Sequence, residues 1–355
     1  MTDVDELIER ARGGDEAAAT ALAGDPDGLP AVLDALARGG PTGLLPSVVV
    51  RLARPDTVPL LIERMAVDQV DVRWACVAGL GASGDPRALD ALLAELDDES
   101  WYEPDRSMVA QALGDFGDPA AVGPLQAVVA ANRREYDETE NPALLLRAAE
   151  ALAKLGDHGA CDAVLEILAS PSEMGRSLAA TVLRLVTGPG VVEALARAAT
   201  RDRSREVRAA AVDPLALLGT PEAVEALVPV CQDDVDDVAV RAHVRLGGVL
   251  GETFDDEDGE EEAAAAWAEH RDDFRPATVH RMGRPLHVPA LVDLLEAESD
   301  PGPRDDLVTE LTLITGLPVA AILRDGGVDA LRRRVDAGPF EDGGLYKWGH
   351  AVPFP

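Results

Sequence analysis

The sequence predicts an all-α protein built as a solenoid of stacked helical hairpins, and three observations support this. Turns that resemble Gly-Asp-Pro recur at intervals of 33, 39, 32 and 31 residues. An arginine near the start of the second helix of each pair recurs at intervals of 33, 41, 29, 32 and 33 residues. Hydrophobic residues make up 47% of the chain but aromatic residues only 3%, so any core consists of Ala, Leu and Val, which let helices approach closely. Two independent markers that share one period indicate a helical repeat array.

The glycine markers are Gly84, Gly117, Gly156, Gly188 and Gly219, and the arginine markers are Arg73, Arg106, Arg147, Arg176, Arg208 and Arg241.

The segment 204–230 shows the repeat most clearly. Val207, Ala211 and Leu215 follow the three-to-four-residue spacing of one helical face. Gly219 can take the left-handed conformation that ends a helix, and Pro221 suits the first turn of the next one. Neither short helix can bury its apolar stripe alone. We therefore expect each pair to stack on its neighbours.

Three segments follow from this pattern. Residues 1–54 are expected to form an N-terminal helical cap, because four short helical stretches are separated there by Gly-rich breaks. Residues 55–251 contain about six helical pairs. Residues 252–355 begin with an acidic linker and continue as a C-terminal helical cap, in which Trp267, Phe274 and Trp348 are suited to cover the open end of the last repeat.

Charge excludes several classes of partner. The formal net charge is −33, from 65 acidic and 32 basic residues. Binding to nucleic acid or to an anionic membrane requires a basic surface, so we expect neither. We find no signal peptide and no apolar stretch long enough to cross a membrane, so a cytoplasmic location is expected. The acidity fits either salt adaptation or a charge-driven binding role, and both explanations stay open.

We find no motif for catalysis, a metal or a cofactor. Cys76, Cys161 and Cys231 are far apart in apolar surroundings and are expected to be buried free thiols. The glycine-rich segment 79–84 ends a helix, so it lacks the strand-to-helix geometry of a phosphate-binding loop. No histidine is followed by glutamate, and no nucleophile motif is present.

Segments 70–96 and 206–230 resemble HEAT repeats of the short bacterial type also found in phycobilin-lyase-related proteins. The resemblance covers roughly residues 55–251. It implies a right-handed superhelix whose second helices line a concave face, and it does not imply lyase activity. The later block with Trp267, His270 and Phe274, continuing to Thr315 and Gly316, resembles a C-terminal region of bacterial HEAT-repeat proteins of unassigned function.

The resemblance also suggests a role for the repeated arginine, which in this family bridges to an acidic turn residue of a neighbouring repeat. We carry this role to Arg73, Arg208 and Arg241, because each follows a valine. The other marker arginines lack that valine.

Two connections differ from the rest and form a candidate binding rim. Residues 97–105 carry Trp101 and Tyr102, and residues 131–141 carry Tyr136, both amid carboxylates. Both segments join a first helix to a second helix, so stacking places them on the same rim. The aromatic residues either cover their own helix ends or bind a partner. The candidate partner-binding residues are Trp101, Tyr102, Glu103, Tyr136, Asp137 and Glu138.

We therefore expect a non-catalytic scaffold that binds another, basic protein through its concave face and this acidic, aromatic rim. The alternative is a HEAT-fold enzyme or a chromophore-handling factor. That alternative requires converging titratable groups or an apolar cleft.

Overall fold

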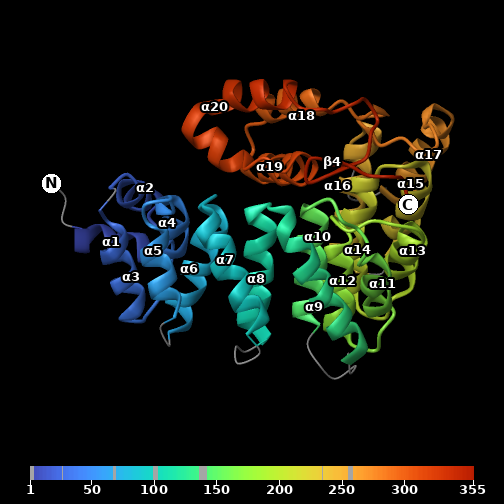
Figure 1. Ribbon diagram of the computed structural model, residues 1–355. Coiled ribbons are helices and arrows are strands. Elements are labelled where there is room, and N and C mark those ends of the chain that lie inside the picture. The colour runs from blue at the N-terminus through green and yellow to red at the C-terminus, as the bar shows by residue number, and fades with distance from the viewer. Residues whose placement is uncertain are drawn as a thin grey trace. The chain divides into compact units, whose positions relative to one another are not determined.

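The structure is a computed structural model that describes residues 4–25, 27–66, 69–98, 103–135, 142–233, 235–254 and 259–355. For residues 103–105, 134–135, 236 and 259–260 it describes the backbone alone. The chain forms two compact units (Figure 1). Unit 1 consists of Met1–Arg134 and Ala143–Leu155, and unit 2 consists of Glu135–Pro142 and Gly156–Pro355. The division lies inside the segment 55–251 that the sequence assigns to the repeats.

Unit 1 is a stack of helical pairs in which the second helices α4, α6, α8 and α10 pack in succession. Its elements are α1 (Val4–Arg12), α2 (Glu16–Ala23), α3 (Leu29–Ala37), α4 (Leu45–Leu52), α5 (Val58–Met65), α6 (Val70–Ala82), α7 (Pro86–Asp97), α8 (Glu103–Phe116), the 3₁₀ turn η1 (Pro119–Ala121), α9 (Val122–Glu135) and α10 (Ala143–Lys154). Close approach depends on small residues. A Cβ on Gly114 of α8 would lie 2.7 Å from the Cα of Ala151 on α10.

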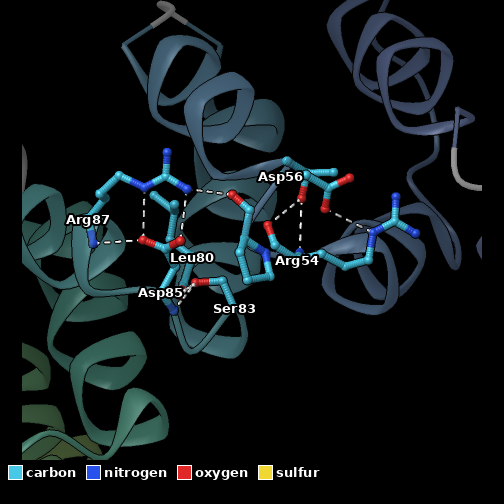
Figure 2. Close-up of polar contacts among 8 residues, drawn as sticks. Arg54, Asp56, Leu80, Ser83, Asp85 and Arg87 are labelled. Carbon is cyan, nitrogen blue, oxygen red and sulfur yellow. Dashed lines mark hydrogen bonds and ion pairs between the residues drawn. The ribbon is translucent and has the colours of Figure 1, made fainter.

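The recurring turn has a defined polar structure (Figure 2). Gly84 has φ +65°, which ends one helix, and Asp85 caps the next by accepting a hydrogen bond from the backbone N–H of Arg87. The Arg87 guanidinium also donates to the Asp85 carboxylate. This side-chain bond and the bond from the backbone N–H of Arg87 together lower the pKa of Asp85 to about 2. Arg87 then donates to the carbonyl of Pro55 in the preceding turn, at 2.6 Å. The turn therefore both starts a helix and ties two successive repeats together.

Unit 2 continues the pairs and adds a C-terminal group of helices. Its elements are α11 (Cys161–Leu168), α12 (Glu173–Val182), α13 (Val191–Arg201), α14 (Arg205–Leu218), α15 (Pro221–Leu227), η2 (Val228–Gln232), α16 (Asp236–Leu250), α17 (Gly259–His270), η3 (Arg271–Asp273), β1 (His280–Arg281), β2 (Arg284–Pro285), α18 (Val288–Ala297), α19 (Pro301–Thr315), α20 (Val319–Asp336), β3 (Tyr346–Lys347) and β4 (His350–Ala351). The second helices α12, α14 and α16 pack in succession, and α18, α19 and α20 pack on one another.

Two short antiparallel hairpins, which the sequence did not predict, anchor the C-terminal group. Both have two-residue turns with positive φ, at Met282 and Gly283 and at Trp348 and Gly349. The turn N–H groups of the first hairpin donate to the carbonyls of residues 248 and 249 at the end of α16, at 3.1 and 2.9 Å. Those of the second donate to the carbonyls of residues 313 and 314 at the end of α19, at 2.7 and 2.8 Å. Each hairpin thus satisfies carbonyls that a helix end leaves without partners.

The main fold predictions are confirmed. The described chain is mainly helical, and the two hairpins contain the strands that it has. The segment 204–230 forms α14 and α15, with Ser204 as the N-cap of α14 and Gly219 in the left-handed conformation at its end. The three cysteines are buried, and none of them forms a disulfide.

Candidate interaction surface

The second helices of unit 2 expose an unusual number of apolar side chains. Met174 and Leu178 of α12 are 63% and 38% exposed, and Val240 and Val244 of α16 are 43% and 60% exposed. Each pair is four residues apart, so its members share one helix face. On α14, which lies between these helices, the corresponding positions include the half-buried Ala209 and Ala210. We call Met174, Leu178, Ala209, Ala210, Val240 and Val244 the second-helix surface.

A cavity of about 180 Å³ adjoins this surface at Val244. It lies between the second helices α14 and α16 on one side and α18 and α19 on the other. Its apolar walls come from Ala216, Leu217, Val249, Leu291, Leu294, Leu307 and Leu313. Met282, at the turn of the first hairpin, also lines the cavity and is 43% exposed. The cavity therefore joins an apolar interior to the exposed second-helix surface.

Ion pairs frame the cavity. Arg245 of α16 donates to Asp213 of α14 at 2.8 Å and holds Asp306 of α19 with two bonds at 2.9 and 3.1 Å. Burial disfavours its charge, but the bonds to Asp306 and the charge of Asp213 outweigh burial and raise the pKa of Arg245. Arg281 of β1 similarly bonds Glu310 of α19. The bidentate pair of Arg245 with Asp306 has a defined geometry, so it helps to fix the position of α19 against the repeats.

Buried rings attach the first hairpin to the end of the repeats. Trp267 and Phe274 are each 6% exposed and form an edge-to-face pair at 5.2 Å. Phe274 stacks on His280 at 4.1 Å, and the backbone N–H of His280 donates to the carbonyl of Gly219 at the end of α14. Burial lowers the pKa of His280, so the neutral ring is favoured. Trp348 contacts Gly316 at the end of α19.

The repeated arginine links successive repeats in unit 2. Arg208 of α14 donates to Asp233, in the turn before α16, at 2.5 and 2.9 Å. Arg176 of α12 makes the same bidentate contact with Asp202, before α14, at 2.7 and 2.9 Å. Arg176 has no preceding valine, so the restriction of this role to Val-Arg pairs was too narrow. An acidic residue 25 or 26 positions after the arginine is a better indicator of the linking contact than the preceding valine.

The other predicted linking arginines differ. Arg241 pairs with Asp213 on the preceding second helix, at 3.4 Å and partly exposed. The buried positions of Val207, Ala211 and Leu215 in α14 correspond to those of Val238, Ala242 and Leu246 in α16. The residue of α16 that corresponds to Arg208 is therefore Ala239 and not Arg241. Arg73 is half-buried on α6, and its charge opposes the rise that burial causes in the pKa of Glu95.

The aromatic residues of the predicted rim lie outside the described part of the chain. Trp101, Tyr102, Tyr136, Asp137 and Glu138 lie outside the described residues. Glu103 begins α8, but its side chain also lies outside the described part. The cavity and its ion pairs were not predicted, because they depend on how the C-terminal helices dock on the repeats.

The chemistry of the described residues is as follows. Burial raises the pKa of the Cys76 thiol to about 12 and that of Cys161 to about 11, so both thiols stay protonated near neutral pH. No group of three or more His, Cys, Asp and Glu side chains in the described ranges is arranged to hold a metal ion. No single described helix has the length and apolar character to cross a membrane. The pair α19 and α20, bent by 103°, meets that criterion only jointly and by length and composition alone.

Comparisons with known proteins identify the repeats. A family model described as HEAT repeats matches residues 59–137, 104–184 and 162–245, which together span more than half of the 355 residues. A comparison with curated proteins gives no match.

Solved structures with similar folds include the CpcE–CpcF complex of phycocyanin lyase from a Nostoc species, at 22% identity and a TM-score of 0.39, covering 72% of this chain and 93% of that one. Human deoxyhypusine hydroxylase has 20% identity and a TM-score of 0.30, covering 69% and 96%. An engineered protein has 17% identity and a TM-score of 0.36, covering 94% and 91%. At these identities the likeness concerns the fold alone.

Proposed function

Because this chain belongs to the HEAT-repeat family, we propose that it is a non-catalytic scaffold that binds another protein through the second-helix surface. One observation carries the proposal. Of the six exposed large hydrophobic side chains in the described chain, four lie on the second-helix surface and a fifth, Met282, lines the cavity beside it. The four are Met174, Leu178, Val240 and Val244, and the sixth, Val70, lies on α6 of unit 1. Apolar groups that gather on one kind of face favour contact with a partner.

The cavity favours a side chain as its occupant. At about 180 Å³ it is smaller than the roughly 300–1,000 Å³ of most small-molecule sites. It is close to the roughly 150 Å³ of an engineered apolar cavity that holds a benzene ring in another protein. A Leu, Met or Phe side chain of a partner fits this size. This size is one reason why we propose a scaffold rather than the alternative, an enzyme or a chromophore-handling factor.

Exposed carboxylates favour a partner with positive charge. Glu173 and Asp237 lie in the first turns of α12 and α16, beside the second-helix surface, whereas Glu206 in the first turn of α14 is paired with Arg205. Carboxylates at the edge of an apolar surface mainly increase the rate of encounter and select against acidic partners. A basic, amphipathic segment complements both features. The predicted rim at residues 97–141 remains a proposed additional contact.

The test uses affinity capture from lysate of the native organism, followed by binding measurements with the purified partner. Val240→Asp with Val244→Asp places two charges on the second-helix surface. Ala17→Asp with Ala320→Asp adds the same charge at exposed positions outside it. We expect the first variant to weaken binding at least about tenfold and the second to leave it within about twofold. Equal affinities for the two variants would remove this surface from the account.

A further inference from the structure

A groove between the first helices α11 and α13 is positively charged in a chain whose formal net charge is −33. Its lining contains four arginines and a single carboxylate, that of Asp202. Arg176 holds both oxygens of Asp202 and also donates to the carbonyls of Ser170 and Pro171. This buried pair is neutral as a whole. The positive charge of the groove therefore comes from the other arginines, Arg197, Arg201 and Arg203.

These three arginines are exposed and have no ion-pair partner among the described residues. None of them forms an ion pair with a described carboxylate, and the contact of Arg203 is a 3.3 Å hydrogen bond to the carbonyl of Pro171. Arg197 and Arg201 are four residues apart on α13, so the two like charges share one helix face and repel each other. Acidic residues outnumber basic ones by 65 to 32, yet no carboxylate in the described part of the chain forms an ion pair with these three arginines. An external anion would relieve the repulsion.

The floor and size of the groove restrict the ligand further. Leu165, Leu168, Ala194 and Ala198 form an apolar floor beneath the arginines. The groove has a volume of about 710 Å³, far more than a single inorganic anion needs. Guanidinium groups match carboxylates in a bidentate geometry. The net charge of the whole chain opposes a long polyanion, but screening over about 8 Å leaves a short segment subject to the local field.

We propose that this groove binds a short acidic segment of a protein, with carboxylates on Arg197, Arg201 and Arg203 and an apolar side chain on the floor between α11 and α13. The site is separate from the second-helix surface and does not rest on the function proposed for it. The scaffold would then have two docking sites of opposite charge preference.

The test is fluorescence anisotropy of the full-length chain with a labelled peptide of sequence Gly-Glu-Glu-Leu-Glu-Glu-Gly. We expect the peptide to bind and its affinity to fall as salt increases. A peptide with Gln in place of Glu, and one with Gly in place of Leu, are each expected to bind more weakly. Arg197→Gln with Arg201→Gln should weaken binding about tenfold or more.

Two further variants control for charge and folding. Arg333→Gln with Arg334→Gln removes the same charge from exposed positions on α20 and should change the affinity less than about twofold. Ala194→Glu introduces a carboxylate into the groove and should also weaken binding, with the circular dichroism spectrum unchanged. The proposal is overturned if the wild-type chain does not bind the peptide, or if the α13 and α20 variants have equal affinities. It is also overturned if inorganic phosphate binds as tightly as the peptide, because the site would then be one for simple anions.

Discussion

Replacing Arg208 by Met should destabilise unit 2 strongly, because it leaves a buried carboxylate without its cation. The side chains of Arg208 and Asp233 are only 11% and 6% exposed, and two bonds of 2.5 and 2.9 Å join them. Arg208 also donates to the carbonyl of Asp202 at 3.0 Å. Breaking one side of a buried pair costs about 3–5 kcal/mol, so we expect a loss of that size in the free energy of unfolding.

Arg241→Met is the matched control, because it makes the same change to the net charge. The pair of Arg241 with Asp213 is 48% and 36% exposed and is 3.4 Å long, so its loss should cost about 0–1 kcal/mol. Urea unfolding followed by circular dichroism measures both values. If Arg208→Met costs no more than Arg241→Met, the linking role of the repeated arginine is refuted. Asp233→Asn, alone and with Arg208→Met, gives the coupling energy of the pair.

Three further outcomes are expected. Gly316→Ala should lower the free energy of unfolding by about 2–4 kcal/mol, because the residue has φ +68° and the new Cβ would lie 2.7 Å from the Trp348 carbonyl oxygen. Gly84→Ala should lower it by only about 1–2 kcal/mol, because the residue has φ +65° but no atom lies within 4 Å of the new Cβ. Urea unfolding measures both values. Burial lowers the pKa of Lys347 from 10.5 to about 7, so the folded chain binds fewer protons than the unfolded chain between these pH values. The free energy of unfolding should therefore rise with pH between about pH 7 and about pH 8.5, by up to about 1.4 kcal/mol per pH unit, and Lys347→Met should remove this contribution. Above about pH 8.5 the thiols of Cys76 and Cys161 ionise in the unfolded chain but stay protonated in the folded chain, which opposes the rise. Cys76 should react with a thiol reagent at pH 8 only after denaturation, because its pKa is about 12.

Each of these outcomes has a clear contradiction. Equal losses for the two glycine variants would show that the second hairpin does not press on the end of α19. A pH slope that persists in Lys347→Met would assign it to other groups. Rapid labelling of Cys76 in the native chain would show that α6 opens readily.

The sequence was sufficient for the features that repeat. Gly219 and Pro221 mark a helix end and a helix start by their own backbone restrictions, so the break between α14 and α15 could be predicted locally. The contact of Arg208 with Asp233 recurs one period earlier at Arg176 and Asp202, which makes it a property of the pattern.

Features that occur once were missed, for physical reasons. The cavity beside Val244 exists only because α18 and α19 dock on α14 and α16, and no local pattern encodes that docking. The hairpin turns use Met282 and Trp348 at positive φ, where the usual sequence signal is Asn or Asp before Gly. The basic groove around Arg197 contains arginines that lie close together in the sequence. It was not predicted, because the inference about charge rested on the net charge of the whole chain, −33.

The central claim is that partners bind the second-helix surface, and site-specific photo-crosslinking tests it most directly. A photoreactive amino acid would replace Val244 in one variant and the exposed Ala17 of α2 in another, and both chains would be irradiated with the captured partner. The account predicts a covalent adduct from position 244 and none from position 17. Adducts of equal yield at both positions, or an adduct at position 17 alone, would contradict it.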